Sequence, residues 1–370
     1  MEKFRVLHAV NHFSPCVGGV ERITEQLCRE LSAKGIECAV VCLDKCAYSR
    51  EKLPKEEEAN GVKVHRVPFL DLKYYKLATK ALKFANGFDL VHVHGLGFFS
   101  DAFSLFSNKK VVINTHGGIW HTKEIGLLKK IYFSTLNRLA LNSADAVIAD
   151  SKSDYEIFKK ICRKTTLLEN GVDVNAMKKL RGKKNFSQFL FVGRLSKNKR
   201  IDLLLETFAE LKRKGIGFRL VVAGEDWEHI LPELQKIARE KGIEREVVFT
   251  GKVSEEELLE LYRESGFFVS ASRFEGFGIS AVEAMAAGCV PLLHENESFR
   301  NFVSDGENGF LLDFQETEKS AEKIAGITGK SIKEIELIAG NAFSSVEKFG
   351  WEKKAGEYIA LYKRVLGESA

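Results

Sequence analysis

Short apolar runs rich in β-branched residues alternate with segments of helical periodicity along the chain, and this alternation limits the folds open to it. Such an alternation is typical of parallel sheets with helices on both faces. In the first half the apolar runs cover residues 4–10, 37–43, 62–67, 89–94, 110–115, 144–149 and 165–169. In the second half they cover 189–192, 218–223, 247–250, 267–271 and 290–293. The sequence therefore predicts an α/β fold with two parallel sheets.

The length of the chain and one polar stretch indicate where the two sheets separate. At 370 residues the chain exceeds the size at which a single hydrophobic core stops growing. The polar stretch 177–187 interrupts the alternation, so we expect the linker there. The prediction is a Rossmann-like N-terminal domain over residues 1–180 and a Rossmann-like C-terminal domain over 185–350. A last helical segment, 351–370, follows the second sheet.

Charge and hydropathy exclude several classes of protein. The net charge is +5, but Lys and Arg are interspersed with Asp and Glu, which argues against a nucleic-acid-binding surface. The excess of positive charge suits an anionic small molecule or a lipid surface. The chain has no run of eighteen apolar residues, and its first ten residues are typical of a strand rather than a secretory signal. We therefore expect a cytoplasmic protein. The same features are compatible with association with the inner face of the membrane.

The cysteines and histidines do not show the spacing of a metal site. The sequence has seven cysteines and no CxxC pair. The even spacing of Cys38, Cys42 and Cys46 is compatible with zinc, but buried free thiols in a reducing compartment are the favoured interpretation. The histidines show no ligand spacing, and no Asp-x-Asp pair is present to hold Mg²⁺. We expect neither a metal nor another cofactor.

Ligands of open parallel sheets bind beyond the carboxyl ends of the strands, and two loops at such positions are candidates. Gly18 and Gly19 precede a helix, where they either let the backbone approach a phosphate or sugar or form a tight turn. The sequence favours neither reading. Arg194 and Lys199 follow the first strand of the second domain. Their position favours binding of one anion over simple solvation.

A third loop, residues 274–279, places glycines before a helix and leaves main-chain amides for an anion. Glu275 and Glu283 flank this helix start, and the hydroxyls of a ribose and a hexose are suitable partners for the two carboxylates. The alternatives are compensation of the helix dipole for Glu275 and a surface charge for Glu283. Because Glu283 lies among apolar residues, its carboxylate needs a partner.

Two features of the first domain lead to different conclusions. His116 ends a strand and is expected at the same cleft as the second domain's loops, although a hydrogen-bonded loop histidine is the alternative. Gly95–Ser100 matches a dinucleotide fingerprint only in part, because Ser100 stands at the third glycine. The next strand also ends without the acidic ribose ligand, which argues against an NAD enzyme.

A set of motifs then identifies a family. In order, they are GGVER, THGG, ENGVD, GRLSKNKR, VVAGED, FTGKVS and SRFEGFGISAVEAMAAGCVP, the last containing an E-x7-E pair as Glu275 and Glu283. With these motifs the chain resembles the retaining glycosyltransferase family 4 over nearly its whole length. The resemblance implies the GT-B fold, in which two Rossmann-like domains face each other across a cleft and the terminal helix packs back on the first domain.

The resemblance also implies roles for residues of the second domain. Arg194 and Lys199 would bind the donor diphosphate and offset charge on the leaving group. Glu275 would contact the transferred sugar, and Glu283 would hold the ribose hydroxyls. The amides of four residues would support the phosphates and the sugar: Gly276, Phe277, Gly278 and Ile279.

Further contacts are implied for both domains. Gly18 and Gly19 would approach the phosphate, and His116 would lie beside the sugar near the reacting carbon. Lys252 and Val253 would meet the base through their backbone. The expected catalytic residues are Arg194, Lys199, Glu275 and His116.

The expected activity is transfer of a hexosyl group from a UDP-, GDP- or ADP-sugar to a hydroxyl in glycan biosynthesis, with retention and without a metal. The acceptor is a glycan, a lipid-linked saccharide or a small molecule. A nucleotide-sugar epimerase, another GT-B enzyme, and a catalytically silent nucleotide-sugar-binding protein are the alternatives. The sequence leaves the sugar, the base and the acceptor open.

Two basic-aromatic stretches raise the question of a membrane contact. One is 123–141, which mixes leucines and aromatic residues with Lys129, Lys130 and Arg138; the other runs from Tyr74 to Lys83. Both suit peripheral docking on an anionic membrane surface. An ordinary amphipathic helix covering a sheet is the slightly favoured alternative.

Overall fold

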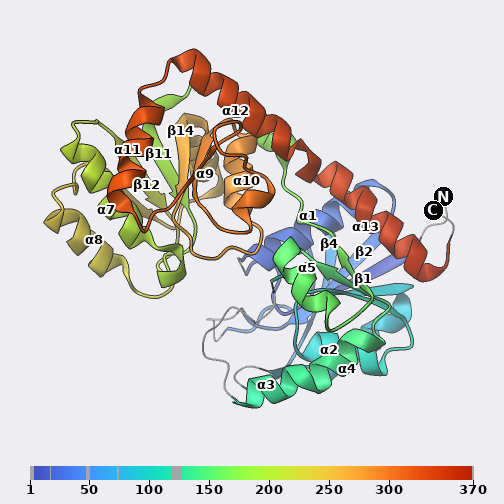
Figure 1. The fold of residues 1–370 in the computed structure, drawn as a ribbon. Coiled ribbons are helices and arrows are strands. Elements are labelled where there is room, and N and C mark those ends of the chain that lie inside the picture. The colour runs from blue at the N-terminus through green and yellow to red at the C-terminus, as the bar shows by residue number, and fades with distance from the viewer. Residues whose placement is uncertain (1–3, 17, 47–50, 73–74, 118–126, 369–370) are drawn as a thin grey trace. The chain divides into compact units, whose positions relative to one another are not determined.

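The computed structural model describes residues 4–16, 18–46, 51–72, 75–117 and 127–368, and these form two compact units (Figure 1). The first unit comprises Met1–Gly171 and Trp351–Ala370, and the second comprises Val172–Gly350. Each unit is built on a predominantly parallel sheet with helices on its faces. The predicted α/β class with two Rossmann-like sheets is confirmed.

The sheet of the first unit has eight strands in the order β10-β9-β8-β7-β1-β2-β4-β3, and only the β3–β4 pair is antiparallel. Its strands are β1 (Arg5–Val10), β2 (Glu37–Leu43), β3 (Glu56–Ala59), β4 (Val62–Val67), β7 (Leu90–His94), β8 (Lys110–Asn114), β9 (Ala146–Ala149) and β10 (Thr165–Leu167), with a separate ribbon of β5 (Leu70–Asp71) and β6 (Lys76–Leu77). Its helices are α1 (Gly19–Ala33), the 3₁₀ helix Thr79–Gly87, α2 (Phe98–Phe106), α3 (Leu127–Ser134), α4 (Leu136–Ser143), α5 (Lys152–Lys159) and α13 (Trp351–Leu366).

The two faces of this sheet differ in chemistry. Because side chains alternate along a strand, Leu7 and Ala9 of β1 enter an apolar core with Phe103 of α2. Between them, His8 belongs to the opposite face, where it pairs in register with His92 of β7. The first unit therefore has one apolar core and one face with buried polar groups.

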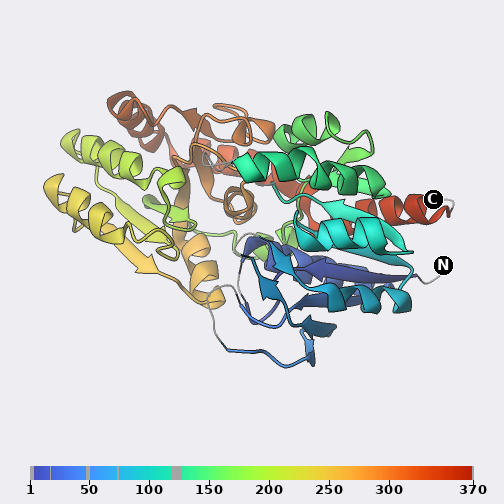
Figure 2. The same cartoon turned by 90° about the horizontal axis from the view of Figure 1, so that it is seen from below.

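Helix α13 covers part of this polar face and supplies matching groups. Tyr362 Oη lies 2.7 Å from His92 Nδ1, and Asn114 Nδ2 donates to Tyr358 Oη over 3.2 Å. Both tyrosines are fully buried, so these polar contacts replace contacts with water. Helix α13 also packs on α1, and Figure 2 shows it in red against the first unit.

The sheet of the second unit has six parallel strands in the order β13-β12-β11-β14-β15-β16. The strands are β11 (Asn185–Val192), β12 (Arg219–Ala223), β13 (Val247–Gly251), β14 (Ser265–Ser270), β15 (Val290–His294) and β16 (Phe310–Leu312). The helices are α6 (Val174–Lys178), α7 (Ile201–Arg213), α8 (Leu231–Glu240), α9 (Glu255–Glu264), α10 (Ile279–Ala286), α11 (Thr317–Thr328) and α12 (Ile332–Val346), with short 3₁₀ turns at Lys197–Lys199, Phe299–Asn301 and Glu347–Phe349.

Both faces of the second sheet are apolar. Along β11, Phe189 and Phe191 enter a core shared with α7, α8 and α11, whereas Leu190 enters a core shared with α9 and α10. Figure 1 shows these two groups of helices on opposite faces of the sheet. Strands buried on both sides appear in the sequence as continuous apolar runs, which explains why they were predictable.

The structure corrects two boundaries. The first unit ends at Gly171 rather than within 177–187, because Val174 and Met177 of α6 are buried in a core of the second unit. The described part of the predicted helix 123–141 forms two helices, α3 and α4, with Thr135 between them. Residues 123–126 lie outside the described residues. The short strands β3, β5, β6 and β16 were not predicted, because they are too short for a clear periodicity.

The prediction that the cysteines are free thiols is wrong for one pair. Cys16 and Cys46 form a disulfide, with their Cα atoms 5.4 Å apart. The partners come from loops after β1 and β2, and no local spacing in the sequence relates two such loops. Cys38 and Cys42 are buried and free, as expected. Among the described helices, none is long and apolar enough to cross a membrane.

The contact between Tyr362 and His92 predicts how removal of the Tyr362 hydroxyl changes the stability of the protein. Tyr362→Phe leaves the buried His92 Nδ1 without this partner, so we expect the free energy of unfolding to fall by about 1–3 kcal/mol. Tyr155→Phe is the matched control, because Tyr155 is only half-buried and its neighbour Lys159 is exposed, so water can replace the contact of the lost hydroxyl. Urea unfolding of both variants measures the difference, and equal midpoints would contradict the role of the hydroxyl.

Candidate functional site

The strand order of the second sheet creates a topological switch point between β11 and β14. From β11 the chain continues to β12 and β13 on one side, and then returns to form β14, β15 and β16 on the other. Loops that leave two such neighbouring strands in opposite directions open a crevice at the carboxyl edge of the sheet. The loop after β11 contains Arg194 and Lys199, and the loop after β14 contains Glu275.

Direct contacts join these two loops. Asn198 Nδ2 donates to the carbonyl oxygen of Phe274 over 2.8 Å, and the amide of Arg273 donates to the carbonyl of Asn198 over 3.0 Å. Lys199 Nζ donates to Glu275 Oε1 over 2.5 Å. The structure therefore brings together two predicted site residues that are 76 positions apart in the sequence.

The pair of Lys199 and Glu275 is largely shielded from water. Their side chains are 17% and 15% exposed. At such burial each charge depends on the other for compensation, because removing one partner leaves a poorly solvated charge behind. A ligand that offers an anion to Lys199 and hydroxyl donors to Glu275 satisfies both groups, whereas a neutral apolar ligand satisfies neither.

Arg194 lies in the same loop as Lys199, and its side chain contacts the loop after β12. Its guanidinium carbon lies 4.6 Å from the ring centroid of Trp227, a cation–π contact. The backbone next to Arg194 is fixed by Gly224, which has a φ of +149° and lies so close that a Cβ atom there would be 1.9 Å from the carbonyl oxygen of Gly193. The loop after β12 thus positions the start of the loop after β11.

The glycine-containing loop before α10 has a defined conformation. Gly278 is the N-cap of α10 with a φ of +92°, in the left-handed region that favours glycine. A Cβ atom at Gly278 would lie 2.8 Å from Phe299 Cε1. Ser298 Oγ lies 2.5 Å from the carbonyl oxygen of Glu275 and 3.1 Å from that of Gly276. Ser298 therefore occupies the carbonyl oxygens of Glu275 and Gly276. Helix α10 begins directly after this loop, at Ile279.

Glu283 is buried in the same helix, and the expectation that it needs a partner is met. It is 6% exposed, and Tyr262 Oη of α9 donates to its Oε2 over 3.0 Å. Phe277, in the loop before the same helix, is also buried. Lys252 and Val253 lie one loop further along the edge, after β13, where the amide of Gly224 donates to the carbonyl of Gly251 over 2.9 Å.

In the first unit, Gly18 and Gly19 lie at the start of α1, directly after β1. The switch point of this sheet lies between β1 and β7, so the two glycines are at the corresponding edge. An added Cβ atom at Gly19 would meet no described atom within 4 Å. At Gly19, therefore, no described atom blocks the predicted close approach of a ligand to this turn.

His116 is engaged more fully than the sequence indicated. Its Nδ1 lies 2.8 Å from Asp150 Oδ2, its Nε2 lies 3.0 Å from His94 Nδ1, and its side chain is 5% exposed. Burial lowers the pKa of His94 well below its usual range, so this ring is neutral. Both ring nitrogens of His116 are therefore occupied, and its main-chain amide also donates to Asn114 Oδ1 over 3.3 Å.

The sequence analysis identified neither Asp150 nor His94 as a partner of His116. Asp150 follows β9 as His116 follows β8, so both belong to the same carboxyl edge. A polar residue at the end of a buried strand was the available signal. All predicted residues of the second unit lie on loops or the helix at one edge of its sheet, while Gly18, Gly19 and His116 belong to the other unit.

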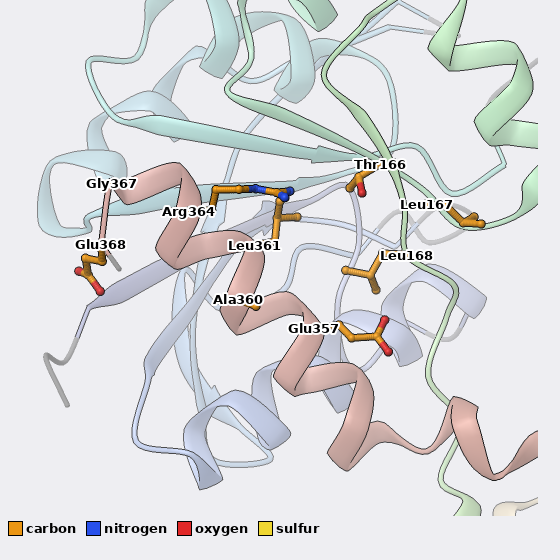
Figure 3. Close-up of a pocket in the computed structure, with 9 residues that line it drawn as sticks. All are labelled: Thr166, Leu167, Leu168, Glu357, Ala360, Leu361, Arg364, Gly367 and Glu368. Atoms are coloured by element: carbon orange, nitrogen blue, oxygen red, sulfur yellow. The ribbon is translucent and has the colours of Figure 1, made fainter. Parts of the chain in front are cut away.

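A cavity of about 650 Å³ lies in the first unit between β10 and α13 (Figure 3). Thr166 and Leu167 line it from the strand, and Glu357, Leu361 and Arg364 line it from the helix. Of the predicted site residues, all of which are described, none lines this cavity. It was not anticipated from the sequence.

Comparison with known proteins agrees with this geometry. Residues 173–336 match the family described as Glycosyl transferases group 1, and residues 17–176 match Glycosyltransferase Family 4. The chain is 30% identical to GDP-mannose:cellobiosyl-diphosphopolyprenol alpha-mannosyltransferase of Komagataeibacter xylinus, covering 100% of this chain and 95% of that one. The enzyme of the same name from Xanthomonas oryzae is also 30% identical, covering 98% and 97%.

Solved structures show the same fold. Sucrose-phosphate synthase from Thermosynechococcus elongatus superimposes with a TM-score of 0.79 at 20% identity, covering 99% of this chain and 100% of that one. HepE of Anabaena, in complex with UDP and glucose, gives a TM-score of 0.74 at 20% identity, covering 98% and 99%. These likenesses confirm the predicted GT-B class.

The glycine at the start of α10 gives a prediction with an internal control. Gly278→Ala introduces a Cβ in the left-handed region against Phe299, so the free energy of unfolding should fall by about 1–3 kcal/mol. Gly276→Ala, two residues earlier, adds a Cβ that meets no described atom within 4 Å, and its effect should stay within about 0.5 kcal/mol. Ligand-free thermal unfolding compares the two, and equal losses would contradict the geometry described for Gly278.

Proposed function

The chain belongs to the glycosyltransferases of group 1 and family 4, and on this premise we propose that it transfers a mannosyl group from GDP-mannose to a lipid-linked saccharide. The names of relatives that match over nearly their whole length specify this donor and a cellobiosyl-diphosphopolyprenol acceptor. The observation that most supports a sugar-diphosphate donor is the shielded pair of Lys199 and Glu275 at the switch point, with Arg194 in the same loop as Lys199.

In the proposed mechanism the cations stabilise the departing GDP. Cleavage of the anomeric C–O bond leaves negative charge on the diphosphate. Arg194, Lys199 and the amino end of α10 would offset this charge, and one such donor can lower the barrier by about 3 kcal/mol. These groups would act without a divalent metal.

Donor binding would exchange partners within the site. The diphosphate would draw the ammonium of Lys199 away from Glu275, and the carboxylate would then accept hydrogen bonds from the sugar hydroxyls. Glu283 would accept from the ribose hydroxyls. The close pairing of Lys199 and Glu275 explains how both charges stay compensated before the donor binds.

We further propose retention of the anomeric configuration through attack from the face of the leaving group. A double displacement needs an accessible carboxylate as nucleophile. Asp150, at the carboxyl edge of the first sheet, is only 3% exposed and lies 2.8 Å from His116 Nδ1, which argues against that role. Exclusion of water around the donor would suppress its hydrolysis.

A nucleotide-sugar epimerase is the alternative that uses the same donor site. It would convert the sugar nucleotide in the absence of an acceptor, whereas the proposed transferase needs one. An assay with GDP-mannose, with and without a polyprenol-diphosphate saccharide, separates the two. Formation of an epimeric sugar nucleotide without acceptor would contradict the proposal.

The donor site predicts a graded set of variants. Arg194→Ala, Lys199→Ala and Glu275→Ala should each lower kcat/KM for GDP-mannose by about 100-fold or more, because each removes a charge aligned with the reacting groups. Lys197→Ala is the matched control. This exposed lysine lies in the same basic loop, and its hydrogen bond to Glu228 uses the backbone amide, which the substitution keeps.

Steady-state kinetics with purified proteins measures these effects. The control variant should retain kcat/KM within about twofold, as expected of a solvated surface charge. Near-normal turnover of Lys199→Ala or Glu275→Ala, or an equal loss in Lys197→Ala, would refute the assignment of the site.

We also propose a peripheral contact with an anionic membrane through α2, α3 and α4. These helices pack on one another and expose Phe106, Ile131 and Leu139 at 76%, 50% and 58%, with the exposed Arg138 nearby in sequence. The second predicted stretch contributes less. Tyr75 and Tyr132 both donate to Asp101 Oδ2, over 3.0 and 2.7 Å, and Tyr74 lies outside the described residues.

Flotation with anionic liposomes at low salt tests this contact. Leu139→Asp should reduce the bound fraction several-fold, because it places a charge where apolar burial is expected. Leu337→Asp is the control, since Leu337 is 66% exposed on α12 of the second unit. Absence of wild-type binding, or equal losses in both variants, would contradict the proposal.

A further inference from the structure

Three buried side chains of the first unit converge on one point that the transfer reaction does not use. They are His8 of β1, Cys28 of α1 and Cys38 of β2, and a ring nitrogen and the two sulfurs lie within 4.8 Å of one another. Their exposed fractions are 0%, 0% and 8%. Their spacing in the sequence gave no sign of this convergence.

A chain of hydrogen bonds fixes the state of His8. Asp150 Oδ2 lies 2.8 Å from His116 Nδ1, His116 Nε2 lies 3.0 Å from His94 Nδ1, and His94 Nε2 lies 3.0 Å from His8 Nδ1. When the three rings are neutral, His116 donates its Nδ1 proton to the carboxylate of Asp150, so its Nε2 is an acceptor. The same argument applies to His94 and then to His8.

The consequence is an unprotonated nitrogen at the end of the chain. His8 carries its proton on Nδ1, and its Nε2 presents a lone pair. This buried Nε2 makes no hydrogen bond of ordinary geometry with the described residues, and the Cys38 thiol is a neighbour that interacts with the His8 ring. A buried acceptor without a partner is unfavourable, and a neutral imidazole whose other nitrogen donates a hydrogen bond is the form in which histidine binds metals.

We propose that His8, Cys28 and Cys38 bind a thiophilic cation, Zn²⁺ in the first instance. Two thiolates and one imidazole form a set that zinc binds in proteins. Tetrahedral zinc places such ligands roughly 3.3–3.8 Å apart, so the group has to contract by about 1.5 Å at most. His94 would be the outer partner that orients the ligating ring.

The neighbouring group of His8, His92 and His94 is a poorer site. Its atoms also lie within 4.8 Å of one another. However, His94 uses both ring nitrogens in the hydrogen-bond chain, and His92 Nδ1 contacts Tyr362 Oη over 2.7 Å. Binding of zinc by His92 and His94 would break these hydrogen bonds, whereas binding by Cys28 and Cys38 would break none of them.

This site is independent of the donor site in the second unit. A metal at His8, Cys28 and Cys38 would link α1 to β1 and β2 within one core and would stabilise the first unit. Its loss should therefore lower the thermal stability of the protein, and the test below does not depend on the identity of the sugar donor.

The test uses the full chain, stripped of metal under reducing conditions and titrated with Co²⁺. We expect thiolate-to-cobalt charge-transfer bands that saturate at one Co²⁺ per chain and disappear when Zn²⁺ is added. Cys28→Ser and Cys38→Ser should each lower the affinity for Zn²⁺ by more than about 100-fold, since loss of an outer-shell contact alone costs up to that much. Cys42→Ser, which removes another buried free thiol of β2, should leave the affinity unchanged.

Two results would overturn the site as a whole, and a third would overturn the choice of its ligands. One is the absence of charge-transfer bands in the wild-type titration, which needs no variant and holds even where a substituted protein fails to fold. The other is a Cys28–Cys38 disulfide, found by peptide mapping, in protein purified anaerobically without chelator. An equal loss of affinity in Cys42→Ser would likewise contradict the assignment of the ligands.

Discussion

An ammonium and a carboxylate 2.5 Å apart, at the switch point of the second sheet, are the contact on which the account of this protein depends. The contact exists because β11 and β14 are neighbours although the chain forms β12 and β13 between them. Two strand ends then deliver opposite charges to one place. The remaining features of the second unit, from the close approach of Gly224 to the left-handed Gly278, hold the two loops in register around that pair.

The first unit differs from the second in that its sheet buries polar side chains. One face of its sheet buries histidines among its aliphatic side chains, and buried polar groups need partners. Helix α13 supplies the hydroxyls of Tyr358 and Tyr362, which explains why a segment that follows the second unit in sequence belongs to the first. The chain from Asp150 to His8 satisfies the remaining rings in series and ends next to Cys28 and Cys38.

Local patterns in the sequence were sufficient for most of the strands and for the glycine-containing loop before α10. They also indicated that Glu283 needs a partner, but not that Tyr262 would be that partner. Contacts between distant segments could not be read from spacing. The disulfide of Cys16 and Cys46 joins two loops that only the folded sheet brings together. Likewise, the engagement of His116 depends on β7 and β9 being its neighbours.

The central claim is that Arg194 and Lys199 bind the donor diphosphate while Glu275 turns to the sugar. A crystal structure with GDP-mannose, or with GDP and mannose, measures this directly. The account predicts diphosphate oxygens within hydrogen-bonding distance of the guanidinium and the ammonium, and Glu275 on a sugar hydroxyl instead of Lys199. A bound nucleotide that leaves Arg194 on Trp227 and Lys199 on Glu275 would contradict it.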